Sequence, residues 1–369
     1  MAKILLIVNL NSGDGIIAKR LVEDIVCPML YNSKVDLSLH FTASAQEAGD
    51  LAEQHIASTP DPETPTILVA GGDGTLHDLV NVLHSRASSG TFPDVNFVLL
   101  PTGTANALYY SFCSPIASDP AHPSIPNGAK EEDLLKLTSL VAYIGKTRRR
   151  AMGVARTSIY ESSSSHPMHT ILSLVVNSTS LHAATLDSAE KYRSTIPGIE
   201  RFKVAAAENV TKWTNAEAEL LPIPGADDAL IWVPKEAEFV PVHDSSISVS
   251  LSGPFFYFLS TINVDRLEPR FVTTPLVKQK PAESGQALDL VIVRPSRNPK
   301  FAGDSETERR AFVELVLPWF KAVYTEGSHL SLAYESEGAP VYMTEYYRVG
   351  GWRWTPKVPH LDMLYPPLN

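Results

Sequence analysis

The stretch that decides the fold is TILVAGGDGTLHDLVN, residues 66–81. It opens with an apolar run, 66–70, of the kind that forms a parallel strand buried on both faces. The run leads directly into Gly71, Gly72 and Gly74, which permit a positive φ and a close approach of the backbone to a ligand. The helical pattern that follows would present free N–H groups and a positive dipole to a phosphate. The segment therefore predicts a strand, a phosphate-binding turn and a helix.

Asp73, in the middle of this turn, is not explained by phosphate binding, because a carboxylate repels phosphate. It fits the turn if Mg²⁺ lies between the two, or if the acid takes a proton from an attacking hydroxyl group. The alternative is purely structural, a tight strand–helix turn in which Asp73 is the N-cap of the helix.

The same alternation of strand and helix surrounds this stretch. The expected strands are 4–8, 35–41, 66–70 and 96–100, and the expected helices are 16–30, 45–58 and 76–84. This order predicts a doubly wound parallel α/β sheet, whose ligands bind beyond the carboxyl ends of the strands. Two further polar turns, 9–15 and 101–106, also follow strands. We expect the three turns to converge on one crevice and to hold a nucleotide.

After residue 150 the pattern changes to short β-rich runs separated by Pro and Gly. The expected strands are 171–176, 229–233, 246–251, 255–262, 288–294 and 329–334, with one helix near 199–213. This predicts an antiparallel, β-sandwich-like second domain. We therefore expect an α/β nucleotide-binding domain at 1–150 and a β-rich lipid-binding domain at 151–369, with the final strands free to return to the first domain.

The composition excludes several classes of protein. The 369 residues carry a formal net charge of -10, so no basic field is available to hold nucleic acid. Two distant cysteines argue against a disulfide framework or a zinc site. The apolar N-terminal residues are interpreted as a buried first strand and not as a signal peptide, and no apolar run approaches the ~20 residues of a membrane-spanning helix. A basic cluster at 146–150 is more typical of a solvated strand edge than of a membrane patch.

The three turns resemble the signature loops of the diacylglycerol kinase and sphingosine kinase catalytic domain. That family carries Asn-Pro-x-Ser-Gly, Gly-Gly-Asp-Gly-Thr and Pro-x-Gly-Thr-x-Asn, which correspond here to residues 9–13, 71–75 and 101–106. Two downstream stretches, 181–193 and 200–202, are similar to the sphingosine kinase branch in particular, and 271–294 is similar to the segment before the family's last strands. The fold also resembles those of NAD kinase and phosphofructokinase.

The resemblance implies an ATP-dependent lipid kinase that phosphorylates the hydroxyl group of a sphingoid base or a diacylglycerol-like lipid. ATP and Mg²⁺ would be the cofactors, with no separate metal site, and Asp73 would be the general base. Arg193 and Arg201 would contact the nucleotide phosphates. The complete set of implied nucleotide-binding residues is Asn9, Asn11, Ser12, Gly13, Thr42, Gly71, Gly72, Gly74, Thr75, Asp78, Gly103, Thr104, Ala105, Asn106, Arg193, Arg201 and Glu345.

The implied partners are ATP, a lipid and, transiently, the surface of a membrane. A cytoplasmic location is expected, nucleic acid is excluded as a partner, and a homodimer is compatible with the sequence.

The chain also departs from the family pattern. Leu10 replaces the proline of the first loop, and Ala184 stands where sphingosine kinases have the Asp that recognises the lipid head group, with Asp187 as a substitute three residues on. Of the family's C-terminal Asp-Gly-Glu only Glu345 remains, unless 337–338 is the match. Two other functions therefore stay open: an NAD kinase-like enzyme, and a non-catalytic protein of this fold that binds nucleotide or lipid. The identity of the acceptor lipid also stays open.

Overall fold

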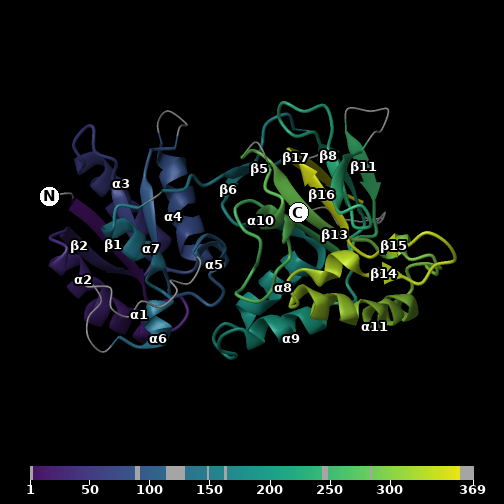
Figure 1. Cartoon of the computed structure of the whole chain (residues 1–369), viewed down its shortest axis with the longest axis horizontal. Coiled ribbons are helices and arrows are strands. Elements are labelled where there is room, and N and C mark those ends of the chain that lie inside the picture. Colours follow the sequence, from purple (N-terminus) through teal and green to yellow (C-terminus); the bar gives the residue numbers. More distant parts are fainter. Residues whose placement is uncertain are drawn as a thin grey trace, which may run out of the picture. The chain divides into compact units, whose positions relative to one another are not determined.

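The computed structural model describes residues 3–87, 92–113, 129–147, 149–161, 164–242, 248–282 and 285–357. The chain divides into two compact units (Figure 1). Unit 1 comprises residues 1–175 and 266–269, and unit 2 comprises 176–265 and 270–369. The division falls after Val175, later than the boundary at 150 that the sequence suggested, because a β-hairpin at 155–173 groups with unit 1.

Unit 1 is built on a four-stranded parallel sheet with the strand order β2-β1-β3-β4. Its strands are β1 (Lys3–Asn9), β2 (Asp36–Thr42), β3 (Thr66–Gly71) and β4 (Asn96–Pro101), each within one residue of the predicted range. Every residue of the central strand β3 is buried, as expected of a strand covered on both faces. The prediction of a doubly wound parallel α/β domain is confirmed.

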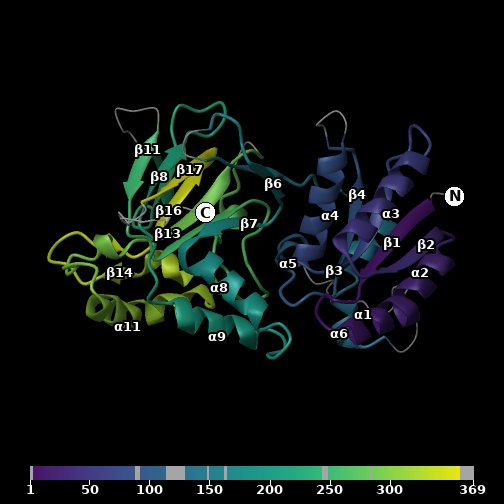
Figure 2. The same ribbon diagram turned by 180° about the vertical axis from the view of Figure 1, so that it is seen from behind.

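Helices cover both faces of this sheet (Figures 1 and 2). They are α1 (Gly15–Leu21), the π-helical η1 (Val22–Val26), α2 (Cys27–Asn32), α3 (Ala45–Ser58), α4 (Asp73–Arg86), α5 (Ala107–Phe112), α6 (Glu131–Leu134) and α7 (Thr138–Ile144). The alternate residues Ile4, Leu6 and Val8 of β1 pack against the helical segment α1–η1–α2 in a core that also includes α7. Helices α3 and α4 pack against each other and contact β1 and β3, respectively.

A separate antiparallel hairpin, β5 (Ala155–Ile159) and β6 (His169–Ser173), forms a two-stranded sheet within unit 1. Asn81 of α4 fastens it. The Asn81 side chain accepts a hydrogen bond from the Leu172 N–H at 2.8 Å and donates one to the Leu172 carbonyl, also at 2.8 Å. The amide thus takes the place of a neighbouring strand at this position.

Unit 2 contains a six-stranded sheet, order β10-β9-β16-β13-β12-β7, and a three-stranded sheet, order β11-β8-β17. Their strands are β7 (Val176–Thr179), β8 (Ala216–Leu221), β9 (Leu230–Val233), β10 (Glu238–Pro241), β11 (Val249–Ser252), β12 (Tyr257–Thr261), β13 (Leu288–Val293), β16 (Glu345–Val349) and β17 (Gly351–Pro356). All these strands pair antiparallel, and a common core joins Leu220 and Leu251 of the smaller sheet to Phe258 and Ile292 of the larger. The predicted antiparallel, sandwich-like character is confirmed, and the final strands β16 and β17 pair within unit 2.

The prediction of a single helix in this part of the chain is wrong. The helices of unit 2 are α8 (Ser180–Lys191), α9 (Glu200–Asn209), α10 (Leu276–Gln279), α11 (Glu306–Val323) and the 3₁₀ turns η2 (Pro295–Arg297) and η3 (Ser328–Ser331). A short pair, β14 (Ala333–Tyr334) and β15 (Val341–Tyr342), follows them. The first half of the expected strand 329–334 is therefore a 3₁₀ turn, and only its last two residues form a strand. Helix α11 begins with a capping box made by Ser305 and Glu308.

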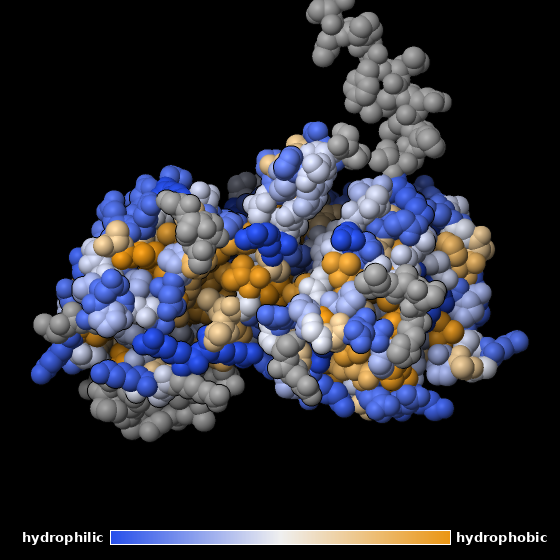
Figure 3. Space-filling view, turned by 90° about the horizontal axis from the view of Figure 1, so that it is seen from above, coloured by the Kyte–Doolittle hydropathy of each residue, from blue (hydrophilic) through white to orange (hydrophobic). Residues whose placement is uncertain are grey.

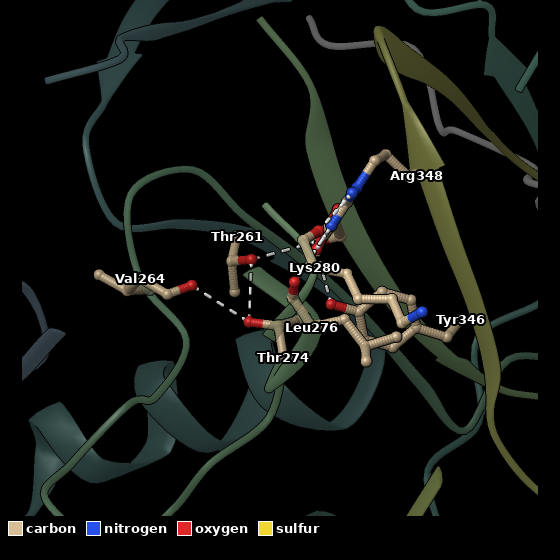
Figure 4. A network of polar contacts seen from close by, with 8 residues as sticks. Thr261, Val264, Thr274, Leu276, Lys280, Tyr346 and Arg348 are labelled. Carbon is tan, nitrogen blue, oxygen red and sulfur yellow. Dashed lines mark hydrogen bonds and ion pairs between the residues drawn. The ribbon is translucent and has the colours of Figure 1, made fainter. Parts of the chain in front are cut away.

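A buried ion pair joins the two central strands of the larger sheet, β13 and β16 (Figure 4). Asp289 and Arg348 lie opposite each other on β13 and β16, and the Arg348 Nε lies 2.7 Å from an Asp289 oxygen. The Tyr346 hydroxyl donates to the same carboxylate at 2.7 Å. The Arg348 guanidinium also donates to the carbonyl groups of Lys280 and Leu276. The pair is fully hydrogen-bonded, which is the condition for burying two charges, and it ties 276–280 to the sheet.

Candidate active site

Three loops of unit 1 meet at the carboxyl ends of β1, β3 and β4. We call residues 9–15 the first loop, 71–75 the second loop and 101–106 the third loop. The Asn9 side chain donates to the Thr75 hydroxyl at 3.0 Å and joins the first loop to the second. The Thr102 N–H donates to the Gly71 carbonyl at 3.2 Å and joins the third loop to the second. The expected convergence of the three turns is thus present within one unit.

Glycines allow the loops to touch through their backbones. A Cβ on Gly103 would lie 2.4 Å from the Gly72 Cα, so these two residues pass each other without room for a side chain. Gly13 has a φ of +61°, and a Cβ there would lie 2.1 Å from the Thr102 carbonyl oxygen. Gly74 differs, because a Cβ on it would meet nothing within 4 Å. Gly74 therefore borders open space at the N-terminus of α4, where N–H groups lack intrahelical acceptors.

The Asp73 carboxylate is held by the backbone of the next helix. One oxygen accepts from the Ala107 N–H at 2.7 Å and the other from the Leu108 N–H at 2.9 Å. These are the first two residues of α5, so Asp73 caps α5 from the first position of α4. The N-cap of α4 itself is Gly72, and the alternative in which Asp73 caps its own helix is wrong.

Burial raises the pKa of the Asp73 carboxyl above its usual range, although hydrogen bonds from the Leu108, Ala107 and Asp73 backbone N–H groups act in the opposite direction. A raised pKa makes the deprotonated carboxylate a stronger base than an exposed aspartate. A carboxylate offers about four lone-pair positions, so two backbone donors leave capacity for another hydrogen bond. The carboxylate can therefore both hold α5 and accept a proton from a bound hydroxyl group.

Asparagines shape the first and third loops. Asn106 has the left-handed conformation, with φ 56°, and its side chain accepts from the Gly103 N–H at 3.0 Å and donates to the Gly103 carbonyl at 2.8 Å. Asn9 accepts from the Asn11 N–H, and the Asn11 side chain donates to the Ala43 carbonyl at 3.2 Å. These bonds set the paths of both loops. A small cavity bordered by Gly71, Gly72, Asp73 and Asn106 lies at this junction.

The remaining predicted residues of unit 1 lie in the first and third loops, at the end of β2 and on α4. Ser12 lies beside Gly72, since its Oγ is 3.2 Å from the position of a Cβ there, and Thr42 is buried at the end of β2, in register with Asn9. Thr104 and Ala105 are half-buried. Asp78 is exposed on α4, where partial burial raises the pKa of its carboxyl group and the neighbouring His77 lowers it.

Three predicted residues belong to unit 2. Arg193 is exposed and paired with Glu190. The Arg201 guanidinium lies 4.7 Å from the Phe202 ring centroid, and its buried Nε has no partner among the described residues. Burial and the positive charge of Arg193 lower the pKa of Arg201. A bound anion would relieve the repulsion between the Arg193 and Arg201 guanidinium groups. Their contact with nucleotide phosphates stays a prediction.

Glu345, the third of these residues, is buried and paired. Its side chain is 4% exposed, and both oxygens accept from the Arg294 guanidinium at 2.7 Å. The Tyr347 hydroxyl adds a third bond at 3.2 Å. This carboxylate is committed to the interior of unit 2, so we leave it out of the proposed nucleotide site. The other departure from the family, Asp187, is paired with Lys191 at 2.8 Å on the exposed surface of α8.

Within the described ranges, no group of three or more His, Cys, Asp or Glu side chains could hold a metal ion. A nucleotide-bound Mg²⁺ does not need such a group, because phosphates and waters supply most of its ligands beside one or two carboxylates. The Asp73 oxygens are bonded to the backbone of α5, so Asp78 is the exposed carboxylate of α4 with the chemistry for that smaller requirement.

A protein-family comparison agrees with the resemblance of the three loops to lipid kinases. Residues 3–136 match the family model described as "Diacylglycerol kinase catalytic domain". None of the curated proteins compared with the chain matches it. A solved structure, "Crystal structure of a putative diacylglycerol kinase from Bacillus anthracis str. Sterne", is 12% identical, covers 96% of this chain and 87% of its own, and has a TM-score of 0.48. A second, "A putative diacylglycerol kinase from Bacillus anthracis str. Sterne", is 13% identical with the same coverage and a TM-score of 0.45. Both likenesses are too remote to bear on function.

Proposed function

We propose that this protein is an ATP-dependent lipid kinase, because residues 3–136 match the family model of the diacylglycerol kinase catalytic domain. The observation that carries the proposal is the Asp73 carboxylate, held by two backbone N–H groups at the junction of the three loops. Family membership supports ATP and a lipid as substrates. The geometry of unit 1 supports the roles that individual residues are given below.

The ATP phosphates would bind at the second loop. Gly74 borders open space at the start of α4, a helix of 14 residues whose free N–H groups and dipole favour an anion. The first and third loops, closely packed against it, would hold the rest of the nucleotide. Mg²⁺ would be held mainly by the phosphates, with Asp78 as the available carboxylate, and would neutralise charge on the transferring group.

Asp73 would act on the acceptor. Its carboxylate takes the proton of the lipid hydroxyl group as that oxygen bonds to the γ-phosphorus and the bond from phosphorus to the β–γ bridging oxygen breaks. The raised pKa of the carboxyl supports this role. ADP leaves with the bridging oxygen, and the phosphorylated lipid is the second product.

The acceptor that the residues favour is an uncharged, diacylglycerol-like lipid. A sphingoid base carries an ammonium group, which a free carboxylate would recognise. Ala184 stands at the family's recognition position, and Asp187 is already paired with Lys191. A sphingoid base remains the second candidate, because 181–193 resembles the sphingosine kinase branch.

The test is transfer from γ-labelled ATP to diacylglycerol, sphinganine and ceramide in detergent micelles, with and without Mg²⁺, and to NAD in a separate reaction. We expect Mg²⁺-dependent labelling of a lipid, strongest with diacylglycerol. Labelling of NAD alone would identify an NAD kinase-like enzyme. Tight ATP binding without transfer to any acceptor would identify a non-catalytic member of the family and refute the proposal.

A further inference from the structure

We propose that the β5–β6 hairpin of unit 1 is a membrane-contact element that binds the surface of an anionic lipid bilayer. Hydrophobic side chains reach the molecular surface in patches among hydrophilic ones (Figure 3). Five of the fourteen large hydrophobic side chains that are exposed in the described part of the chain lie between residues 154 and 171. They are Val154, Ile159, Tyr160, Met168 and Ile171. No other stretch of this length concentrates as many among the described residues.

The pairing of the strands places four of these side chains toward the tip, the loop end of the hairpin, whereas Val154 precedes β5 at the base. Ile171 pairs with Thr157, so it lies on the same face as Ile159, its diagonal neighbour across the hairpin. Tyr160 and Met168, at the loop end, are 54% and 52% exposed. The base is different, because Leu172 is buried and bonded to Asn81 of α4. The hairpin therefore has a fixed, buried base and exposed apolar side chains next to its loop.

The tip lacks support from other strands. β5 and β6 form a sheet of two strands only, and such hairpins are marginally stable in water on their own. Side chains as apolar as Ile159 and Tyr160 would be stabilised by a second surface. Clusters of this kind on a soluble unit mark an interaction site.

The charge near the hairpin selects an anionic surface. Arg149, Arg150 and Arg156 are exposed, and none of them forms an ion pair with another described residue. Between 149 and 171 the only acidic residue is Glu161, although the chain as a whole carries a net charge of -10. Arg156 is opposite Leu172, so the arginines lie at the base of the hairpin and most of the exposed apolar side chains lie nearer the loop. A segment that combines exposed apolar side chains with an excess of arginine favours the interface of a bilayer with acidic head groups. The basic cluster at 146–150, which the sequence pattern assigned to a solvated strand edge, is thus proposed to face acidic lipid head groups.

The inference deepens the proposed function and rests on it for its purpose, since an enzyme that phosphorylates a membrane lipid must reach the bilayer. Within the described residues, no helix is long and apolar enough to cross a membrane. The hairpin would supply reversible attachment. The proposed partner of the hairpin is the surface of the bilayer and not a single lipid molecule.

The experiment is sedimentation of the full chain with phosphatidylcholine vesicles, either pure or containing about 30% phosphatidylserine. Tyr160→Ser with Met168→Ser removes apolar area, and Arg149→Gln with Arg156→Gln removes charge. The controls are Tyr31→Ser, a side chain 67% exposed on α2, and Arg310→Gln on α11. We expect binding to the acidic vesicles to fall about 25-fold for the arginine pair, roughly fivefold for each charge, and by a similar factor for the apolar pair. The controls should bind as the wild type does.

Three results would overturn the inference: no binding of the wild type to acidic vesicles, equal binding of hairpin variants and wild type, or a change of oligomeric state in the hairpin variants with unchanged vesicle binding. The last would assign the hairpin to contacts between copies of the chain. Phosphoryl transfer to lipid in detergent micelles separates this from the kinase proposal. Hairpin variants should keep that activity, and a wild type that binds vesicles through the hairpin without transferring phosphate would refute only the kinase.

Discussion

At the scale of single residues, Asp73 serves two purposes that one substitution can separate. Asp73→Asn keeps one oxygen acceptor but turns an NH₂ group toward one of the two backbone N–H donors of α5. We expect turnover to fall about 10²- to 10⁴-fold and the free energy of unfolding to fall by about 1–3 kcal/mol. Lipid phosphorylation and thermal unfolding, measured on the same preparation, test both effects.

The control for Asp73 is Asp78→Asn, which changes an exposed carboxylate of the same helix and should leave the unfolding temperature unaltered. Retained turnover in Asp73→Asn would remove Asp73 from the role of base. Unchanged stability would show that the bonds to Ala107 and Leu108 contribute little.

Two glycines of the loops give opposite predictions. Gly103→Ala places a Cβ 2.4 Å from the Gly72 Cα, so we expect the loops to separate, with loss of both stability and ATP affinity. Gly74→Ala places a Cβ in open space in the first turn of α4, where alanine favours the helix by up to about 1 kcal/mol. We expect this variant to keep or gain stability and still to lose ATP affinity, because the methyl group occupies the phosphate position. Calorimetric ATP titration and thermal unfolding measure the two properties, and undiminished ATP binding by Gly74→Ala would place the phosphates elsewhere.

The sequence could predict that the three loops converge but not which contacts each loop residue makes. The glycine pattern indicated a close backbone approach, yet it could not distinguish Gly103, which contacts another loop, from Gly74, which borders open space. The partners of Asp73 were missed because they are backbone N–H groups, which any residue type supplies. Glu345 was assigned from a short motif, and a motif carries no information about Arg294, 51 positions away.

At the scale of elements, the strands of unit 1 were predictable and the helices of unit 2 were not. Apolar runs that end in glycine or proline delimit β3 and β4 to within a residue. Helix α11 was missed although Ser305 and Glu308 form a capping box, because Pro318 interrupts its pattern. The stretch at 329–334 alternates like a strand, but its first part is a 3₁₀ turn that buries His329 and Leu330.

The buried pair of Glu345 and Arg294 permits a test of the structural role of Glu345. Glu345→Gln leaves Arg294 without a charged partner in a buried setting, and breaking such a pair costs about 3–5 kcal/mol of unfolding free energy. We expect a much lower unfolding temperature with an unchanged dissociation constant for ATP in the folded protein. Glu335→Gln, which removes an exposed pair with Lys300, is the matched control and should change neither. Weaker ATP binding by folded Glu345→Gln would restore this residue to the nucleotide site.

At the scale of the whole molecule, the buried His329 and the half-buried His182 make unit 2 sensitive to acid. Burial lowers the pKa of His329 to about 4, and that of His182 to about 4 as well. In the unfolded chain a histidine has a pKa near ~6.5, so the unfolded state binds more protons between these values. Stability should therefore decrease as the pH falls from about 6.5 to about 4.

Thermal unfolding as a function of pH measures this slope. His329→Gln keeps a side-chain donor for the Thr273 carbonyl, to which the His329 Nε2 is bonded at 3.1 Å, and it should flatten the slope. His166→Gln, at an exposed position, should leave the slope unchanged. Identical slopes in the wild type and His329→Gln would locate the acid sensitivity in other groups.

Helix α4 connects the proposed catalytic residue Asp73 to the proposed membrane-contact hairpin, which is bonded to Asn81. Asp73 is the first residue of α4, and Asn81, which grips the hairpin, lies about 12 Å further along the helix axis. A displacement of the hairpin on binding a bilayer would thus act on α4, the helix whose first residue is the proposed proton acceptor Asp73. Membrane binding and the position of Asp73 would then both depend on α4. Loss of the two hydrogen bonds between the Asn81 side chain and Leu172 would separate the two effects.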